Sequence, residues 1–295
     1  MVRQMRDTQP SSRSTSCCLF CGRPWGQVTK SREHVLGQWM RKHERELLTR
    51  PQVSYQSGLD LTDDAKHFME LPTNVVMRKA ALLTLKTREV CEDCNTGWMS
   101  KLEQLVEPLI LRMVEATRNA DAIILSKDDA KSLGMWAQKT ALTFELTSAP
   151  PRVANAEMGT RLRSSKPLRA AMVWAARHPR DYDLSIGLAH IDISKTPVPR
   201  PGPPDRQILL VGIVYHSMTL LVFVTDSPGQ APPPIPLDGW TLIWPAFGPV
   251  EFPSMRTVPG NEVTEIIANH SKWLPMVHVS GIHRSIAPPR VSRRN

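Results

Sequence analysis

Three short stretches of sequence decide how the first third of this chain folds: C-L-F-C (Cys18–Cys21), S-R-E-H (Ser31–His34) and C-E-D-C-N-T-G-W-M (Cys91–Met99). The chain contains five cysteines, and four of them form the two C-x-x-C pairs. Zinc prefers four ligands in a tetrahedral arrangement, and a tight C-x-x-C turn offers two thiolates to one ion. The spacing therefore predicts one structural zinc site whose ligands are Cys18, Cys21, Cys91 and Cys94.

Length and composition limit the class of protein. At 295 residues the chain is long enough for about two domains, and its hydrophobic content of 41% is enough for a packed core. Paired cysteines in such a cysteine-poor chain favour metal binding in a reducing compartment over disulfides, so we expect a cytoplasmic protein. Cys17 is left over, and it could replace Cys18 as a ligand, although C-x-x-x-C makes a poorer turn. We expect no membrane partner, because no apolar run approaches ~20 residues and the polar start lacks the apolar segment of a secretory signal.

The net charge of +9 is concentrated at the two ends of the chain. Residues 1–50 have a net charge of +6 and residues 266–295 a net charge of +5, which leaves −2 for the residues between them. Basic ends around a nearly neutral middle favour a polyanionic partner such as DNA. The simpler alternative is that basic tails only keep the chain in solution.

The order of the patterns predicts an α+β protein. A zinc-stapled domain comes first, a helical middle segment follows, and a small β-rich domain without a recognisable chemical motif comes last. The expected boundaries are a disordered basic leader at 1–16, the zinc domain at 17–120, a helical connector at 121–150, the β-rich domain of unknown role at 151–280 and a basic tail at 281–295.

Several elements can be predicted from local patterns. Apolar residues recur at helical spacing over 98–113, and Pro108 should kink or split this helix. A capping-box pattern at Ser126 predicts the start of a second helix. The segment 208–225 consists of two apolar runs joined by a short polar turn, which predicts a β-hairpin. A last helix is expected over 262–273.

Glu33, His34 and Asn95 are the candidate catalytic residues. A histidine with a pKa near neutrality suits a general base, and a carboxylate together with an amide oxygen can hold Mg²⁺ or Mn²⁺. Glu33 and His34 are expected on a short strand, which would direct their side chains to opposite faces unless a bulge or turn re-aims one of them. Asn95 directly follows the zinc ligand Cys94, so the zinc site should fix its position. This is a combination that metal-dependent phosphodiester hydrolysis requires.

The order C-x-x-C, acidic residue–His, C-x-x-C-Asn resembles the HNH, or ββα-metal, endonucleases, and within them the endonuclease VII-like branch that has a four-cysteine structural zinc. The run C-N-T-G-W-M-S-K-L-E (Cys94–Glu103) is similar to a recurring signature of bacterial and phage HNH-type proteins. The resemblance covers residues 17–105. It implies a zinc-stapled ββα-metal domain that hydrolyses DNA phosphodiester bonds.

By position, the resemblance implies that His34 is the general base and that Glu33 and Asn95 bind a catalytic Mg²⁺ or Mn²⁺. The sequence departs from the family pattern in three respects. Glu33 stands where aspartate is commoner, and Asn95 takes the place of the last histidine of H-N-H. The 56 residues between His34 and Cys91 exceed the compact motif, so the middle asparagine can only be assigned to Asn74 by guess.

Three basic residues near these motifs, Lys30, Arg32 and Arg88, are the candidates for DNA phosphate contacts. Two alternatives stay open. The chain could be a non-catalytic zinc-ribbon protein that binds nucleic acid, or the zinc could only staple a fold whose function lies in residues 151–280. The sequence also leaves open whether the chain forms a homodimer.

Overall fold

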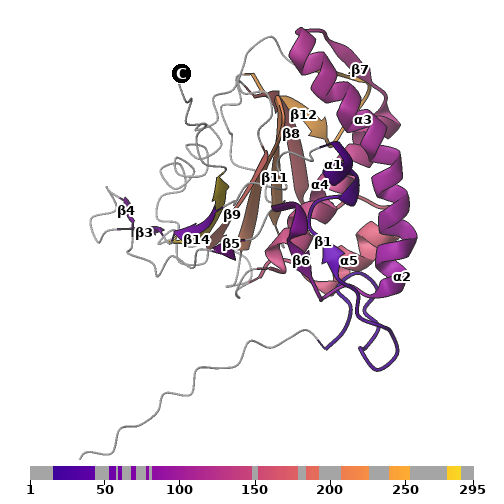
Figure 1. Cartoon of the computed structure of the whole chain (residues 1–295), viewed down its shortest axis with the longest axis vertical. Helices are drawn as coiled ribbons and strands as arrows, with labels where there is room; N and C mark the ends of the chain where they lie inside the picture. The colour runs from indigo at the N-terminus through magenta and orange to yellow at the C-terminus, as the bar shows by residue number, and fades with distance from the viewer. Residues whose placement is uncertain are drawn as a thin grey trace, which may run out of the picture.

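The computed structural model describes residues 16–43, 82–147, 152–178, 184–192, 207–225 and 239–252, and the backbone of five further strands. These strands are β2 (Val53–Ser57), β3 (Leu59–Leu61), β4 (Phe68–Glu70), β5 (Arg78–Lys79) and β14 (His278–Ile286). The chain is a mixed α+β protein, as the sequence predicts (Figure 1). Most of the leader, Asn74 and the helix expected over 262–273 lie outside the described residues.

The largest element is an antiparallel sheet of eight strands in the order β12-β8-β11-β10-β9-β14-β2-β5. The predicted hairpin is confirmed: β10 pairs with β11 from Ile208↔Thr225 to Tyr215↔Met218. Strands β2 and β5 come from the long insert between His34 and Cys91, and β14 reaches into the segment expected to be a basic tail. Sequence segments far apart therefore meet in one sheet. Its remaining strands are β8 (Ala171–Arg177), β9 (Leu184–Asp192), β10 (Gln207–Tyr215), β11 (Met218–Thr225) and β12 (Thr241–Trp244).

The described helices lie on one side of this sheet (Figure 1). Helix α4 packs against β8, β11 and β12, and α3 packs against α4. The helical elements are α1 (Gln38–His43), α2 (Glu92–Cys94), a π-helical turn η3 (Asn95–Met99), α3 (Ser100–Asn119), α4 (Lys127–Glu145), α5 (Ala156–Arg163) and a short 3-10 turn η2 (Leu82–Thr84). Three two-stranded sheets complete the described fold: β1 (Glu33–His34) with β6 (Lys86–Thr87), β7 (Ile123–Leu125) with β13 (Val250–Phe252), and β3 with β4.

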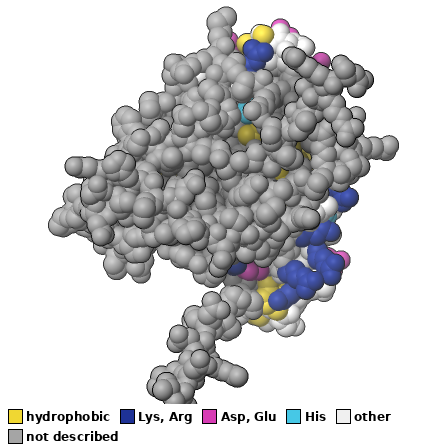
Figure 2. Space-filling view, turned by 60° about the vertical axis from the view of Figure 1, so that its left-hand side comes forward, with side chains coloured by type: hydrophobic (Ala, Val, Ile, Leu, Met, Phe, Trp, Pro, Cys, Tyr) yellow, Lys and Arg dark blue, Asp and Glu magenta, His cyan; other side chains and the backbone are white. Residues whose placement is uncertain are grey.

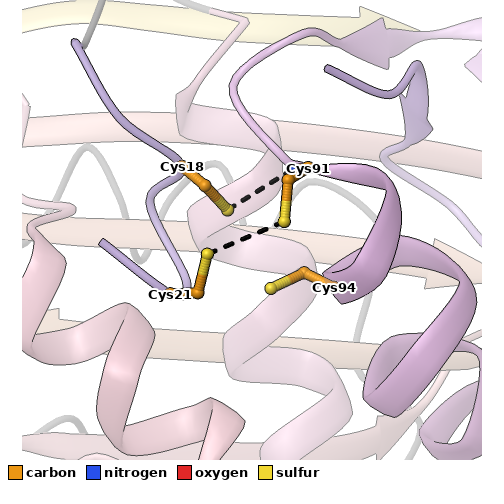
Figure 3. Close-up of side chains that lie close together, drawn as sticks. All are labelled: Cys18, Cys21, Cys91 and Cys94. Atoms are coloured by element: carbon orange, nitrogen blue, oxygen red, sulfur yellow. Dashed lines mark hydrogen bonds between the residues drawn. The ribbon is translucent and has the colours of Figure 1, made fainter. Parts of the chain in front are cut away.

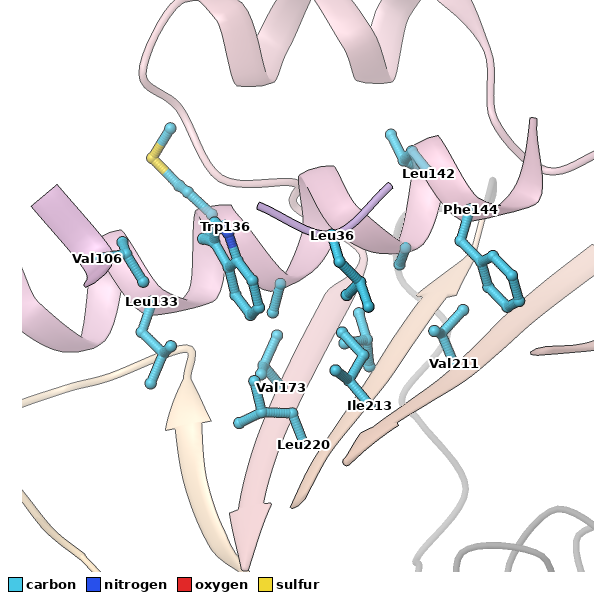
Figure 4. Packing of buried hydrophobic residues seen from close by; sticks show 14 of the residues in the cluster. Leu36, Val106, Leu133, Trp136, Leu142, Phe144, Val173, Val211, Ile213 and Leu220 are labelled. Atoms are coloured by element: carbon cyan, nitrogen blue, oxygen red, sulfur yellow. The ribbon is translucent and has the colours of Figure 1, made fainter. Parts of the chain in front are cut away.

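Helix α4 begins where the sequence predicts it. The Ser126 side chain accepts from the N–H of Asp129 at 3.1 Å, and the Asp129 carboxylate accepts from the N–H of Ser126 at 3.1 Å, which completes a capping box. Leu133, Trp136 and Phe144 of α4 point toward the sheet (Figure 4). Leu36, just after β1, points toward Ile213 between helix and strands. Burial of Leu36 therefore anchors β1 to the core.

Pro108 does not split the helix, one of the two outcomes that the sequence predicts, because α3 runs through it without interruption. Pro108 lies on the exposed side of α3, so water can satisfy the carbonyl that its missing N–H leaves without a partner. The helical path is distorted earlier, at Gly97 within η3, where φ is −87° and ψ is −107°. The irregular turn thus directly follows the second cysteine pair.

Hydrophobic residues from the expected zinc domain, the helical connector and the β-rich segment belong to one cluster. Phe20, Leu36 and Met99 share it with Trp136 of α4 and with Val211 of the sheet. The described parts of these segments therefore have a common core, and the zinc motif is built onto the face of α3 and α4. None of the helices in the described part of the chain is both long enough and apolar enough to cross a membrane.

Candidate functional site

The first C-x-x-C pair lies in a tight turn that its own backbone closes. The N–H of Gly22 donates to the carbonyl of Cys18 at 2.9 Å, and the N–H of Cys18 donates to the carbonyl of Arg23 at 3.0 Å. Gly22 has a φ of +68°, a left-handed conformation that glycine adopts without strain. The turn directs the sulfurs of Cys18 and Cys21 toward the second pair (Figure 3).

The second pair, Cys91 and Cys94, lies at the start of α2 and is tied to the first. The N–H of Cys91 donates to Sγ of Cys18 at 3.3 Å, and a β-bridge pairs Lys30 with Cys91. The N–H of Asn95 donates to the carbonyl of Cys91 at 3.0 Å. The backbone of Asn95 is therefore fixed by the same turn that places the two sulfurs.

The four sulfurs converge as the sequence predicts and could hold a metal ion such as zinc (Figure 3). All four lie within 4.8 Å of one another, and Sγ of Cys21 is 3.7 Å from Sγ of Cys91. A tetrahedron with zinc–sulfur bonds of about 2.3 Å has edges of about 3.8 Å. The hydrogen bond from the Cys94 thiol, together with backbone N–H groups such as that of Cys91, lowers the pKa of Cys18 to about 4 despite its burial. The donor set and its spacing fit a structural zinc.

The segment after α4 holds the cysteine cluster from outside. The guanidinium of Arg152 donates to both carboxylate oxygens of Glu89, at 2.8 and 2.7 Å, just before the second pair. Helix α5 lies against the first pair, and a Cβ added at Gly159 would be 2.2 Å from the carbonyl oxygen of Leu19. The residues that follow α4 therefore contact both cysteine pairs, α5 at the first pair and Arg152 next to the second.

Glu33, His34 and Asn95 line one pocket of about 230 Å³ beside this cluster. Glu33 and His34 are the two residues of β1, and Asn95 opens η3. The side-chain N–H of Asn95 donates to Oγ of Ser31 at 2.8 Å, which leaves the amide oxygen as an acceptor. Residues in or next to α1 and α3 complete the lining: Gly37, Gln38, Trp39, Lys42, Met99, Ser100, Glu103, Gln104 and Glu107.

Glu33 and His34 line the same pocket, which is the exception that the sequence leaves open where a bulge or turn re-aims one side chain. Alternation of side chains requires an extended run, whereas β1 has two residues and the chain bends directly after His34. The bend also buries both residues, which are 6% and 7% exposed.

A fully buried lysine, Lys139 of α4, lies behind the pocket. Its Nζ donates to Oε1 of Glu103 at 2.6 Å and to Oε1 of Glu33 at 3.5 Å. Glu103 also accepts the indole N–H of Trp39 at 2.6 Å and that of Trp136 at 2.9 Å. These bonds use both oxygens of Glu103 and hold Glu33 from the side opposite the solvent.

The pocket's charge favours a cation. Three lining carboxylates, Glu33, Glu103 and Glu107, face two ammonium groups, that of buried Lys139 and that of exposed Lys42. Burial raises the pKa of Glu33, and the charge of Lys139 opposes this. Burial alone would lower the pKa of Lys139, but the charges of Glu103 and Glu33 outweigh burial and raise it, so the lysine remains charged.

His34 is set up to be a neutral imidazole. Its Nε2 is buried and has no hydrogen-bond partner among the described residues. Burial lowers the pKa of His34 to about 4, with contributions from the positive charges of Lys86, Arg41 and Lys139. At neutral pH the ring is therefore unprotonated and can accept a proton.

The three predicted phosphate contacts lie outside the pocket. Lys30, Arg32 and Arg88 are exposed around β1 and β6, and Nζ of Lys30 lies 4.6 Å from the ring centroid of Trp25. On the face shown in Figure 2, Lys and Arg side chains gather toward the lower end, where β1, β6 and the first cysteine pair lie in Figure 1. Their placement beside the pocket is compatible with DNA contact.

Sequence reasoning missed Glu103, Trp39 and Lys139. Glu103 is the last residue of the run C-N-T-G-W-M-S-K-L-E, and its place in that run could have marked it as a candidate site residue. Lys139 had none, because 106 residues separate it from Glu33 and only the packing of α4 brings the two together. Comparisons with protein-family models, with curated proteins and with solved structures find no match to this chain.

Proposed function

We propose that this chain is a metal-dependent HNH-type endonuclease that hydrolyses DNA phosphodiester bonds. One observation carries the proposal: Glu33, His34 and Asn95, which come from distant parts of the sequence, line a single pocket beside the four-cysteine cluster. This is the set of residues to which the family resemblance assigns catalysis. The surplus of carboxylates in the pocket adds independent support for a bound cation.

The donor atoms of the pocket fit Mg²⁺ or Mn²⁺. The carboxylate of Glu33 and the free amide oxygen of Asn95 are hard oxygen ligands, which these ions prefer. When bound, such a cation polarises the scissile phosphate and stabilises the leaving oxygen. Zinc would be held by the cysteines, where it stabilises the fold around Asn95.

Within this proposal, Nε2 of His34 takes a proton from the water that attacks the phosphorus atom. The depressed pKa keeps the ring in the accepting form at neutral pH. Ser31 orients the amide of Asn95, and Lys139 with Glu103 limits the movement of the Glu33 carboxylate. Lys30, Arg32 and Arg88 would contact DNA phosphates on the surface around the pocket.

A plasmid-nicking assay with Mg²⁺, Mn²⁺ or EDTA tests the proposal. We expect metal-dependent cleavage by the wild type and at least about a hundredfold loss in His34→Ala, the range for removal of a general base. His216→Gly is the matched control, because His216 lies in the turn between β10 and β11, outside the pocket lining, at a φ of +54° that glycine adopts without strain. Absence of cleavage with every metal, together with DNA binding that persists in EDTA, would instead support a non-catalytic zinc-ribbon protein.

A further inference from the structure

A second hollow, which we call the Trp244 pocket, lies on the α4–α5 side of the sheet and shares no lining residue with the candidate catalytic pocket. It has a volume of about 350 Å³ and lies between α4, the end of α5 and the end of β12. Four cationic side chains and one aromatic ring line it: Lys131, Arg161, Lys166, Arg169 and Trp244. No aspartate or glutamate is among its lining residues.

The cations stand on a rigid frame. Helix α5 ends in a Schellman motif: the N–H of Lys166 donates to the carbonyl of Arg161 at 3.1 Å, and Ser165 adopts a φ of +57°. The Nε of Arg161 donates to the carbonyl of Pro167 at 2.7 Å, and the N–H of Leu168 donates to Oε1 of Gln138 at 2.8 Å. The loop that presents the cations is therefore fixed to both α5 and α4.

Trp244 is directed into this hollow by a change of register in β12. Leu242 pairs with Trp174 and Trp244 with Val173, so Ile243 is the extra residue of a β-bulge, which re-aims the side chain that follows. The Trp244 side chain then lies over Gly134 of α4, where an added Cβ would be 2.8 Å from Cβ of Trp244. The indole is only partly buried in this position.

No acidic residue in the described part of the chain neutralises the positive charge of the Trp244 pocket. In the part of the chain that the structure describes, Lys131, Lys166 and Arg169 have no acidic partner. Cations at the C-terminal end of α5 could be explained by their favourable interaction with the helix dipole. That explanation does not cover Lys131 and Arg169, which belong to other segments. Unpaired cations around a partly exposed indole are the combination that binds a single nucleic-acid strand, because phosphates pair with the cations and a base stacks on the ring.

We infer that the Trp244 pocket binds an unpaired nucleotide of a DNA strand, with the base on Trp244 and the flanking phosphates at Lys166 and Arg169. The inference extends the proposed nuclease function to single-stranded or distorted DNA, but the binding itself requires neither cleavage nor a divalent cation. Helix α4 contributes Lys131 to this pocket and Lys139 to the ion network behind the catalytic one, eight residues apart or about 12 Å along the helix.

The test measures fluorescence anisotropy of a labelled oligothymidine of about twelve nucleotides with zinc-loaded full-length protein in buffer without added Mg²⁺ or Mn²⁺, because a chelator would also remove the structural zinc. We expect Lys166→Ala/Arg169→Ala to bind about tenfold or more weakly and to reduce the slope of log K against log salt by about 1.4. The control Lys127→Ala/Arg163→Ala removes two exposed cations from α4 and α5 outside the pocket and should bind like the wild type. Trp244→Leu should weaken binding about tenfold, and Trp244→Tyr, which keeps a stacking ring, should restore most of it.

Three outcomes would overturn the inference: no measurable binding of the oligothymidine by the wild type, equal loss in the pocket and control variants, or equal affinity of the wild type for a duplex of the same length. Circular dichroism identifies a Trp244 variant that has not folded, and in that case the lysine–arginine variant alone decides. Oligothymidine binding without plasmid cleavage would refute the nuclease proposal and leave the pocket standing. Cleavage with no effect of the pocket variants would do the reverse.

Discussion

Replacing Lys139 by methionine should destabilise the folded chain more than any other single charge removal in the described helices. Lys139 is fully buried and its ammonium group serves two carboxylates, those of Glu103 at 2.6 Å and Glu33 at 3.5 Å. Removal of one partner from a buried ion pair costs about 3–5 kcal/mol, because the remaining charge stays buried without compensation. The indole donors of Trp39 and Trp136 still stabilise Glu103, so we expect about 3–4 kcal/mol.

Urea unfolding of the zinc-loaded protein, followed by far-UV circular dichroism, measures this cost. Lys127→Met, at the exposed start of the same helix, is the control and should change stability by less than about 0.5 kcal/mol. The double variant Lys139→Met/Glu103→Gln should be less destabilised than the sum of its single changes, since it removes one of the stranded charges. A cost below about 1 kcal/mol for Lys139→Met would refute the buried ion network behind the pocket.

Three further predictions follow from the site. Wild-type protein should contain one zinc per chain by elemental analysis, and Cys91→Ser should lose it whereas Cys17→Ser should retain it, since Cys17 is outside the cluster; zinc retained in Cys91→Ser would contradict the ligand assignment. The pKa of His34 is lowered from 6.5 to about 4, so as the pH falls the unfolded chain binds a proton before the folded chain does. The free energy of unfolding should therefore fall as the pH drops from 6.5 toward 4. His34→Gln should flatten this part of the pH profile of urea unfolding, and an unchanged profile would argue against a buried neutral ring. Gly159→Ala should lower the midpoint of thermal unfolding, because its Cβ would collide with the Leu19 backbone, whereas Gly26→Ala, with open space around it, should not; equal midpoints would contradict the packing of α5 on the first cysteine pair.

The features that the sequence predicts correctly are those set by local rules. Ser126 begins α4 because its capping box involves only neighbouring residues, and the 208–225 hairpin follows from two apolar runs around a tight turn. The convergence of the four cysteines could be predicted because two C-x-x-C pairs in a chain with few cysteines are typical of a shared metal site. The split at Pro108, one of the two predicted outcomes, does not occur because solvent exposure, which the local sequence does not contain, decides its cost.

The rest of the site depends on contacts between distant segments. Lys139 looks like one charge within an amphipathic helix until α4 is packed behind β1, and the strands from the insert join a sheet built mostly after residue 170. The Trp244 pocket likewise depends on a β-bulge and on a helix end that the sequence gives no reason to place together. The sequence therefore predicted Glu33, His34 and Asn95 of the candidate catalytic pocket. It predicted neither the Lys139–Glu103 ion pair behind them nor the Trp244 pocket.

Chemical rescue of His34→Gly tests the central claim most directly. The measurement is the single-turnover rate of supercoiled plasmid nicking in Mg²⁺, with and without added imidazole, compared with His216→Gly. If His34 is the general base of an endonuclease, the variant should be inactive alone and should regain cleavage in proportion to the concentration of neutral imidazole, while His216→Gly cleaves normally and does not respond. Full-rate cleavage by His34→Gly without imidazole, or no cleavage by the wild type itself, would contradict the account.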